Sequence, residues 1–539
     1  MFSVVPKDFP ISRQRRRSVC GTLMACLQVL ISMKLLQYLT FLLLLISASA
    51  PAKDPLAGLA DWVDAERERW GIPGLAVAIV QGDEVLLAQG FGYLDLDRSR
   101  PVDADTQFGI ASLSKAMTAT ALGILVDEGL LNWDDRVVDH LPGFSLSDPW
   151  VSAQVTIRDL LSHRVGVGRL FGNRLTFMPA ASRGQALAVL RHHEFEQPFR
   201  QGYVYSNAMY AAAGAVLEAI SGQAWEDFVE QRLFAPMAMT RSNTRLSALD
   251  DNAARPHQEI RGELVEIDRR DWTWGAPAAA VNSTVSDLAR WMLFNLNGEL
   301  EGKELVSEDV LKAIHAPSNL TGFDPDYHGV SAYGLGWGLG RYQTFHVLRH
   351  GGATDGINSL VWLLPELELG IVVSANRFTG FNTALAREVV DRFAGLDSTD
   401  WSGQLLEDNR EARADAAADR EDVDRERQAE TAMSRPLADL LGEYFHPLYG
   451  SAEVILDNGE PALRLWQDDS QRLVLKHWHH DTFKARWINP AQREKFVWFA
   501  MGEDGLPAEL NVRFTLRPLA LEEGVYPANY VRIVRYLRQ

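Results

Sequence analysis

Cysteine is nearly absent from this sequence, and its scarcity excludes several kinds of chemistry. The chain has 539 residues but two cysteines, Cys20 and Cys26, and both precede residue 53. If the chain is cleaved near that point, as argued below, the mature protein contains no thiol. It would then have no disulfide, no cysteine-based metal site and no cysteine nucleophile.

Positive charge is also in short supply. The formal net charge is -18, and few of the basic residues are lysines. Phosphate binding needs clustered Lys and Arg, so this balance excludes a nucleic-acid surface and disfavours any polyanionic ligand. With 47% hydrophobic and 23% charged residues the chain is globular in class, and its length predicts at least two domains.

A long apolar run occurs near the N-terminus, from Leu35 to Ala50. Lys34 precedes it, and small residues through Ala52 follow it. This is the pattern of a secretory signal, so we expect residues 1–52 to be removed and the protein to be periplasmic or secreted, without stable membrane insertion. The alternative is an uncleaved signal anchor lengthened by the apolar stretch from Val19 to Ser32.

Strand patterns lie at both ends of residues 53–396, and helical patterns lie between them. Predicted strands are Leu75 to Val80, Glu84 to Tyr93, Gly334 to Arg341, Phe345 to His350, Asn358 to Leu364 and Leu369 to Ser374. Predicted helices are Pro55 to Trp70, Ser112 to about Gly129, most of 134–315, and Thr383 to Phe393. The sequence therefore predicts an α/β domain of the α+β type, whose single sheet combines N- and C-terminal strands and carries an inserted helical region.

The last third of the chain divides into a charged linker and a β-rich domain. Residues 397–435 form the predicted linker, in which residues 407–430 are dominated by Asp, Glu, Arg and Ala, a composition typical of a solvated helix or a disordered linker. Residues 436–539 contain alternating, aromatic-rich runs separated by turns, which predicts a small β-barrel or sandwich. His477, His479 and His480 lie there, but His alternating with Trp on a strand is more typical of packing than of a metal site. We expect no metal and no cofactor.

Ser112-Leu113-Ser114-Lys115 is the one Ser-x-x-Lys in the sequence. At i and i+3 of a helix, the Ser112 hydroxyl and the Lys115 amine are neighbours. A serine hydroxyl is a poor nucleophile until a base removes its proton, and a lysine whose pKa is depressed by burial can be that base. The tetrapeptide alone is weak evidence for catalysis, but the apolar residues on both sides of it indicate that the helix begins within a hydrophobic core.

Two further motifs suit the same chemistry. In Tyr205-Ser206-Asn207 the phenol can shuttle a proton and the Asn207 amide can hold an acyl carbonyl. In His350-Gly351-Gly352-Ala353 the paired glycines allow a substrate to lie against a strand, and the Ala353 and Ser112 N–H groups can form an oxyanion hole. Each motif alone is more often structural.

In this order, the three motifs resemble those of the serine β-lactamase and penicillin-binding protein superfamily, whose characteristic motifs include Ser-x-x-Lys. Within it, residues 55–396 are similar to the class C branch, which includes DD-carboxypeptidases, D-aminopeptidases and β-lactamase-type esterases. Supporting stretches are Phe108 to Lys115, Thr156 to His163, Ser286 to Met292 and Tyr333 to Trp337. The resemblance implies an antiparallel sheet with flanking helices, a helical subdomain and an active site between them. It also implies an accessory β-domain at the C-terminus.

The resemblance implies a role for each matched residue. Ser112 would be acylated, Lys115 and Tyr205 would share base and proton-shuttle duties, and Asn207 would bind the amide of the substrate's acyl side chain. The third motif departs from the family's Lys-Thr-Gly, because His350 replaces a lysine that attracts the substrate carboxylate, and a mostly neutral imidazole holds it less firmly. Pro277-Ala278-Ala279-Ala280 likewise departs from Pro-Ala-Gly-Gly, which predicts a different pocket wall.

The sequence therefore predicts an exported serine hydrolase that cleaves an ester or amide of a small molecule or peptide through a Ser112 acyl-enzyme. A β-lactamase or DD-carboxypeptidase is one alternative. A catalytically silent binding or sensor module of the same fold is the other, although loss of turnover usually removes Ser, Lys or Tyr first. Substrate identity and oligomeric state stay open.

Overall fold

The structure, a computed structural model, describes residues 54–168, 182–260, 262–324, 329–492, 494–513 and 533–538. The expected signal segment, residues 33–52, and both cysteines lie outside these ranges, so export stays a prediction. Within the described ranges, no helix combines the length and apolar character needed to cross a membrane.

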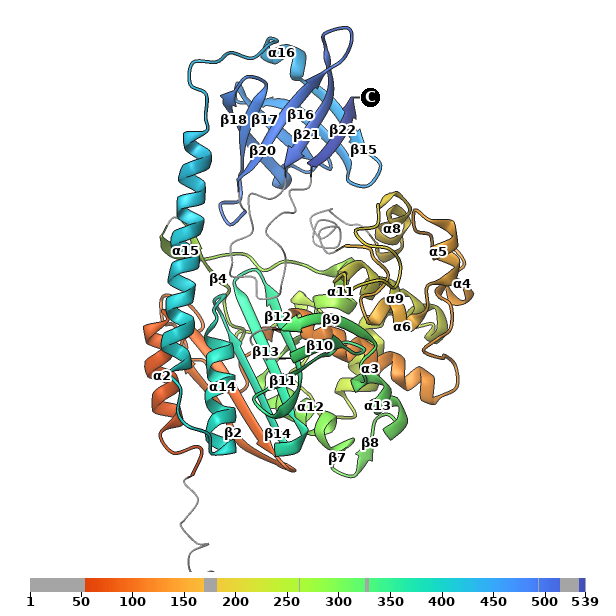
Figure 1. The fold of residues 1–539 in the computed structure, drawn as a ribbon, viewed down its shortest axis with the longest axis vertical. Helices are drawn as coiled ribbons and strands as arrows, with labels where there is room; N and C mark the ends of the chain where they lie inside the picture. The colour runs from red at the N-terminus through yellow and green to blue at the C-terminus, as the bar shows by residue number, and fades with distance from the viewer. Residues whose placement is uncertain are drawn as a thin grey trace, which may run out of the picture. The chain divides into compact units, whose positions relative to one another are not determined.

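An antiparallel sheet of eight strands forms the centre of the first domain (Figure 1). Every residue of its strand β1 except Gln81 is buried, which explains the continuous apolar run there. Leu75 of β1 pairs with Ala375 of β14, so the N- and C-terminal segments meet within one sheet as predicted. In sheet order the strands are β2 (Glu84–Gly92), β1 (Gly74–Gln81), β14 (Leu369–Ala375), β13 (Ile357–Leu364), β12 (Phe345–Thr354), β11 (Gly338–Tyr342), β10 (Gly329–Tyr333) and β9 (Asn319–Asp324).

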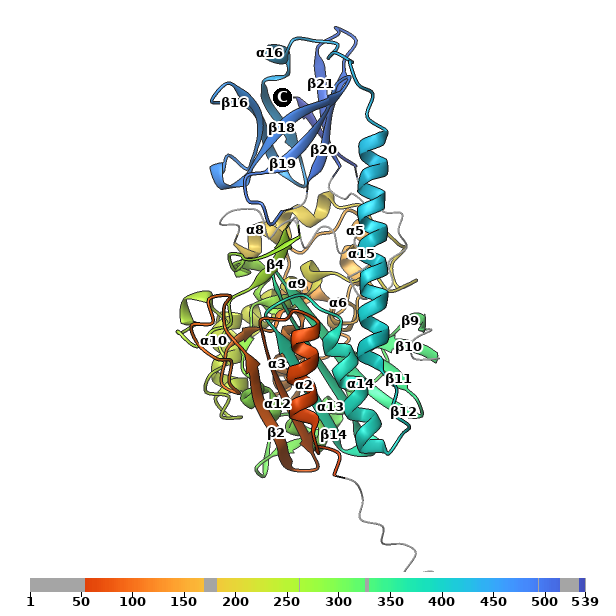
Figure 2. The same ribbon diagram turned by 90° about the vertical axis from the view of Figure 1, so that its left-hand side faces the viewer.

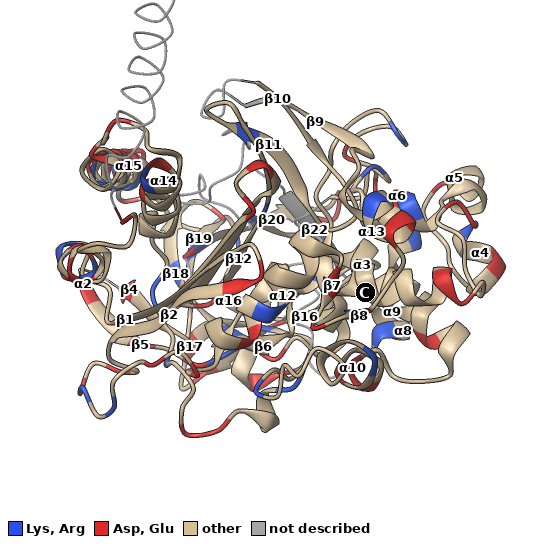
Figure 3. Cartoon of the chain, turned by 90° about the horizontal axis from the view of Figure 1, so that it is seen from below, with Lys and Arg blue, Asp and Glu red and all other residues tan. Residues whose placement is uncertain are grey.

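Helices cover both faces of this sheet. α12 (Val285–Asn297) packs on one face, and α2 (Leu59–Arg69) and α14 (Phe381–Ala394) lie on the other (Figures 2 and 3). Phe381 holds these last two helices together, because its ring centroid lies 5.8 Å from that of Trp62 and 6.1 Å from that of Trp70. The predicted α+β architecture is confirmed.

The inserted region between the two sets of strands contains the predicted helices, but helices make up less than half of the described residues within 134–315. Three short strand pairs also lie in it: β3 (Phe108–Gly109) with β6 (Asn282–Ser283), β4 (His257–Ile260) with β5 (Glu263–Glu266), and β7 (Glu299–Leu300) with β8 (Lys303–Glu304). Residues close to the helix ends determine where individual helices begin and end. Thr156 and Asp159 form a capping box at the start of α6, and Gly222 ends α9 in the left-handed conformation. The helices are α3 (Ser114–Asp127), α4 (Val137–His140), α5 (Pro149–Gln154), α6 (Ile157–Leu161), α8 (Arg183–Ala188), α9 (Asn207–Ser221), α10 (Trp225–Val229), α11 (Ala276–Ala279) and α13 (Glu308–His315).

Two of the predicted elements are wrong in detail. The predicted strand from Gly334 to Arg341 begins too early, because residues 334–337 connect β10 to β11 and β11 begins at Gly338. The reason is tertiary: a Cβ on Gly336, which has φ +86°, would lie 2.7 Å from Cα of Ala116, so the chain turns tightly against α3. The helix predicted from Ser112 instead begins as a 3₁₀ turn, Ala111–Leu113, before α3. Strands β9 and β10 were not predicted.

The C-terminal residues form the linker helix and the β-domain that the composition predicts. Helix α15 (Trp401–Arg425) spans the charged stretch, and a short helix α16 (Leu437–Leu440) precedes the β-domain. That domain is a closed barrel rather than a sandwich. Its strands in order are β15 (Gly442–His446), β16 (Gly450–Asp457), β17 (Glu460–Leu465), β18 (Arg472–His479), β19 (Thr482–Trp487), β20 (Lys495–Met501), β21 (Pro507–Arg513) and β22 (Ile533–Arg538).

The histidines at the end of β18 and just after it bond to protein groups. His477 Nε2 donates to the carbonyl of His480 at 2.8 Å, and His480 Nε2 donates to Oε1 of Gln428 at 2.7 Å. Among the residues that the structure describes, no group of three His, Cys, Asp or Glu side chains is placed to hold a metal ion.

Candidate active site

Ser112 lies in the 3₁₀ turn that leads into α3, and its side chain is half-buried. The turn is held from both sides. The Ile110 N–H donates to the Val281 carbonyl at 2.9 Å, and the Ser114 hydroxyl donates to the Ala111 carbonyl at 2.6 Å. Ala111 has φ +46°, a rare conformation for a residue with a Cβ. This backbone is therefore constrained by its surroundings to present Ser112.

Lys115 is completely buried, and its ammonium group faces Ser112. Nζ donates to Ser112 Oγ at 3.0 Å and to the carbonyl of Ala278 at 3.0 Å. It also lies 4.6 Å from the ring centroid of Tyr205 and 5.3 Å from that of Tyr210, within the range of a cation–π contact. The two side chains of the Ser-x-x-Lys motif therefore meet, as the i,i+3 spacing predicts.

Tyr205 reaches the same hydroxyl from the opposite side. Its phenol donates to Ser112 Oγ at 2.8 Å, although the two residues are 93 positions apart in sequence. Ser112 Oγ thus lies within proton-transfer distance of both an amine and a phenol. Asn207, two residues later, is the first residue of α9 and is buried.

His350 lies on β12, next to Tyr333 of β10. Its Nδ1 is 2.7 Å from the Gly351 carbonyl, which can only accept, so Nδ1 carries the proton. Nε2 then accepts a hydrogen bond from the Tyr333 hydroxyl at 2.8 Å. Burial raises the pKa of Tyr333 well above its usual value, which keeps that phenol protonated as a donor.

The imidazole of His350 is therefore neutral. Burial, together with repulsion from the Lys115 ammonium, lowers the pKa of His350 from 6.5 to about 3. The third motif has no cation at its first position at neutral pH. This agrees with the sequence-based interpretation that the site holds a substrate carboxylate weakly.

The neutral state of His350 predicts a specific loss of stability in acid. Because the pKa is lower in the folded state than in the unfolded state, the unfolded chain binds the extra proton, and stability falls as the pH drops from 6.5 toward 3. We expect this one group to account for about 2 kcal/mol of lost stability between pH 7 and pH 5. In urea unfolding followed by tryptophan fluorescence, His350→Gln should show a correspondingly smaller pH dependence. The same pH dependence in both proteins would contradict the prediction.

Strand β12 comes very close to the turn that carries Ser112. A Cβ on Gly352 would lie 2.0 Å from the Ile110 carbonyl oxygen and 2.9 Å from Cδ1 of Leu113, so glycine is required there. Gly351 and Ala353 on either side are exposed. The strand therefore brings an open edge beside the hydroxyl, which suits the predicted use of the Ala353 N–H.

A cavity of about 600 Å³ lies at the end of β12, where Thr354 and Asp355 line it. Ala279 and Ala280 line it, so the segment in which the sequence departs from Pro-Ala-Gly-Gly does form a pocket wall. On the other side, Arg270 makes a bidentate ion pair with Asp355 at 2.8 Å, and Trp272 Nε1 donates to the Thr354 hydroxyl at 3.3 Å. Further lining residues include Gly109, Thr244, Arg245, Leu246, Ala276, Asn282 and Ile357.

Three residues contribute contacts that the motif analysis did not assign. Tyr333 binds His350, Ala278 accepts from Lys115, and His163 packs against Tyr205 with a ring-centroid distance of 4.3 Å. All three lie in stretches that carry the family resemblance or depart from it. The signal was therefore present, but only the fold shows which partner each residue meets.

Comparison with known protein families finds two matches along the chain. The family described as Beta-lactamase matches residues 59–395, and a domain of unknown function, DUF3471, matches residues 426–523. The first match covers the sheet, the inserted helices and all the residues that meet at Ser112. The second covers most of the barrel.

Two curated relatives illustrate the similarity. Unguisins hydrolase ungD' of Aspergillus campestris is 28% identical over 506 residues, covering 87% of this chain and 91% of the relative. Protein flp of Staphylococcus aureus is 27% identical over 324 residues, covering 58% of this chain and 61% of the relative.

Solved structures share the fold. The octameric penicillin-binding protein homologue from Pyrococcus abyssi superposes with a TM-score of 0.58 at 20% identity, covering 85% of this chain and 98% of that one. The D-amino acid amidase from Ochrobactrum anthropi SV3, complexed with D-phenylalanine, gives a TM-score of 0.55 at 21% identity, covering 64% of this chain and 99% of that one.

Proposed function

Because the chain belongs to the Beta-lactamase family, as the three motifs predict, we propose that it is a serine hydrolase that cleaves an ester or amide through an acyl-enzyme on Ser112. One observation carries the proposal. The Ser112 hydroxyl is contacted by Lys115 Nζ at 3.0 Å and by the Tyr205 phenol at 2.8 Å. A nucleophile needs a base at this distance, and here two groups can serve.

The reaction that follows from this arrangement has two halves. Either Lys115 or Tyr205, in its deprotonated form, accepts the Ser112 proton while Oγ bonds to the substrate carbonyl carbon. The negative charge on the carbonyl oxygen is stabilised by the N–H groups of Ser112 and Ala353. The bond to the leaving group then breaks, and the leaving group takes up the proton. Water repeats the attack on the acyl-enzyme, which releases the acid and restores Ser112.

The neutral His350 favours one class of substrate over another. An enzyme that selects its substrate by a carboxylate beside the scissile bond would place a cation there. The pairing of His350 with Tyr333 at 2.8 Å supports an esterase or peptidase whose substrates need no such carboxylate. It argues against the alternative of a β-lactamase or DD-carboxypeptidase.

The cavity beside β12 supports a bulky acyl group. Its volume of about 600 Å³ exceeds what a small acyl group fills. The charged side chains around it are largely paired, as in the bidentate bond between Arg270 and Asp355. We therefore propose that the acyl side chain of the substrate is large and uncharged, such as an aromatic amino acid residue, and extends past the end of β12 into this cavity.

Labelling with a fluorophosphonate tests the nucleophile. The folded protein is expected to gain the mass of one phosphonyl group on Ser112, because the probe reacts with an activated serine hydroxyl. Ser112→Ala should gain none, while the control Ser145→Ala, changed in a loop outside the site, should be labelled at the original rate. Mass spectrometry of the intact protein and its peptides gives the site. Labelling that persists in Ser112→Ala, or no labelling of the folded protein, would contradict the assignment.

A substrate panel then separates the hydrolase from a silent binding module. p-Nitrophenyl esters, D-amino acid amides and nitrocefin should be compared for the wild type and Ser112→Ala. Hydrolysis of an ester or amide is expected to depend on Ser112, with nitrocefin the poorest substrate. Equal rates for the two proteins with every substrate would support the module that binds without turnover.

A further inference from the structure

His163 lies directly behind Tyr205 and makes no hydrogen bond to Ser112 that would give it a part in the chemistry. Its side chain is completely buried. The ring centroid lies 4.3 Å from that of Tyr205, 5.2 Å from that of Tyr210 and 4.9 Å from that of Tyr333. The imidazole is therefore the centre of an aromatic cluster that includes one of the groups contacting the nucleophile.

Both backbone neighbours of Tyr205 are bonded to this one residue. The Val204 N–H donates to the His163 carbonyl at 2.9 Å, and the Ser206 N–H donates to His163 Nδ1 at 3.1 Å. Because Nδ1 accepts, it carries no proton, and the imidazole is the neutral tautomer with hydrogen on Nε2. The ring nitrogen and the main-chain oxygen of His163 together hold the backbone of Tyr205 on either side.

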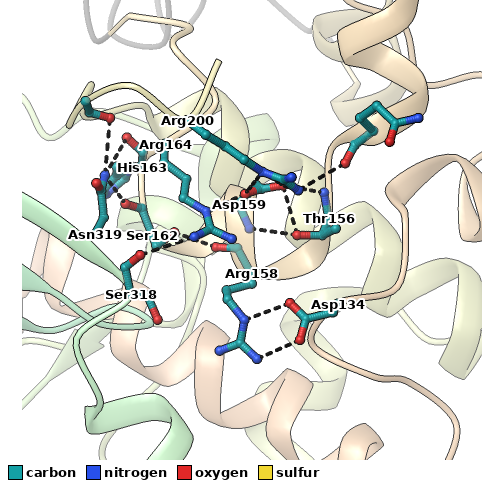
Figure 4. A network of polar contacts seen from close by, with 12 residues as sticks. Asp134, Thr156, Arg158, Asp159, Ser162, His163, Arg164, Arg200, Ser318 and Asn319 are labelled. Carbon is teal, nitrogen blue, oxygen red and sulfur yellow. Dashed lines mark hydrogen bonds and ion pairs between the residues drawn. The ribbon is translucent and has the colours of Figure 1, made fainter. Parts of the chain in front are cut away.

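His163 is itself held in an uncommon conformation. Its φ is +60°, which costs about 1 kcal/mol or more for a residue with a Cβ and persists only where the surroundings impose it. Asn319 Nδ2 donates to the carbonyl of Ser162 at 3.0 Å and to that of His163 at 3.4 Å (Figure 4). Strand β9, which carries Asn319, therefore helps to impose this backbone.

The buried carboxylate of Asp159 connects the segment around His163 to the segment that leads to Tyr205. Asp159, which is completely buried, bonds Nη2 of Arg200 at 2.6 Å and Nε of Arg164, and it accepts from the Thr156 N–H at 2.9 Å (Figure 4). The Arg200 N–H in turn donates to the Arg164 carbonyl at 2.8 Å. The chain leading to Tyr205 is thus fastened to the chain around His163 at several points.

We propose that His163 is a positioning residue for the Ser112 reaction, acting through Tyr205. Its Nδ1 and ring face hold the phenol at the 2.8 Å distance from Ser112 Oγ. The inference rests on the proposed function, since it concerns the rate of acylation of Ser112. A displacement of a catalytic group by about 1 Å costs on the order of 100-fold in rate.

The test separates the contribution of the Nδ1 hydrogen-bond acceptor of His163 from the contribution of its aromatic ring. His163→Phe keeps a ring face but removes the acceptor, and His163→Ala removes both with less steric risk. His163→Asn keeps an acceptor one bond beyond Cγ, as Nδ1 is, and Asn tolerates positive φ. We expect kcat for a p-nitrophenyl ester to fall about 100-fold in the first two variants, with KM changed less than about threefold. His163→Asn should recover at least about tenfold of that loss.

A double-mutant cycle with Tyr205→Phe shows whether the effect passes through the phenol. In the Tyr205→Phe background, His163→Ala is expected to cost less than about threefold, because the group that it positions is already gone. Equal losses in both backgrounds would mean a general structural role and would overturn the proposal. So would wild-type acylation in folded His163→Ala, or a His163→Asn variant as slow as His163→Ala.

The outcomes also distinguish this proposal from the proposed function itself. If the wild-type protein is not labelled by a fluorophosphonate at Ser112, the hydrolase assignment fails. If the wild type is labelled and His163→Ala is labelled equally fast, the hydrolase assignment stands and the positioning role fails. Circular dichroism and the thermal midpoint of each variant establish that it is folded.

Discussion

Lys115→Met is expected to lower kcat/KM about 10³-fold while leaving the protein at least as resistant to thermal unfolding as the wild type. The activity falls because the variant removes the amine that, once deprotonated, can accept the Ser112 proton, and such groups contribute roughly 10²- to 10⁴-fold. Stability is maintained because the wild-type ammonium is fully buried, with a cost of desolvation that a methionine of similar length does not bear.

The opposite signs of the two effects make this prediction specific. Steady-state kinetics and fluorophosphonate labelling measure the first effect, and thermal unfolding measures the second. Lys312→Met is the matched control, because Lys312 is exposed and pairs with Glu308 on the surface of α13. It should keep activity within about twofold, since surface ion pairs contribute little. If Lys115→Met keeps more than about a tenth of the activity, Tyr205 alone is the base.

His350→Lys is expected to change which substrates are preferred. In the wild type the imidazole is neutral and is held by Tyr333, so nothing at this position attracts a carboxylate. A lysine would supply a charged donor, and a hydrogen bond to a charged group contributes about 1.5–3 kcal/mol. The ratio of kcat/KM for a peptide with a free carboxylate to that for its amide should therefore rise about 10- to 100-fold.

His350→Gln is the control for this change, because it keeps a neutral hydrogen-bonding side chain. Its preference ratio should stay within about threefold of the wild type. The lysine variant is also expected to melt at a lower temperature, since a second cation would then be buried near Lys115. If the variant folds and the ratio does not move, residue 350 does not face the part of the substrate that carries the carboxylate.

The motifs of the candidate site could be identified from the sequence because the spacing of their residues is local. Ser112 and Lys115 are three residues apart at the start of a helix, and the helix geometry brings their side chains together whatever the rest of the chain does. Tyr205 was included in the predicted site because the three motifs follow one another in the order that the superfamily has. The sheet, its N- and C-terminal strands and the barrel also followed from apolar periodicity.

The partners of those motifs could not be predicted in the same way. Strand β9 and its Asn319 have little apolar periodicity, since Leu320 and Phe323 are both more than 60% exposed. The pairing of His350 with Tyr333 joins β12 to β10, and β10 was not among the predicted strands. Such contacts depend on sheet register, which is set by packing over the whole domain.

The sequence by itself determined the family, the order of the domains and the residues proposed to carry the chemistry, because motif spacing and hydrophobic period are local properties. Only the tertiary structure decided how those residues are used. It brings Tyr205 across 93 positions to the Ser112 hydroxyl, buries His350 as a neutral group and places His163 behind the phenol. These outcomes depend on burial and on distances between remote segments, and no local pattern specifies either.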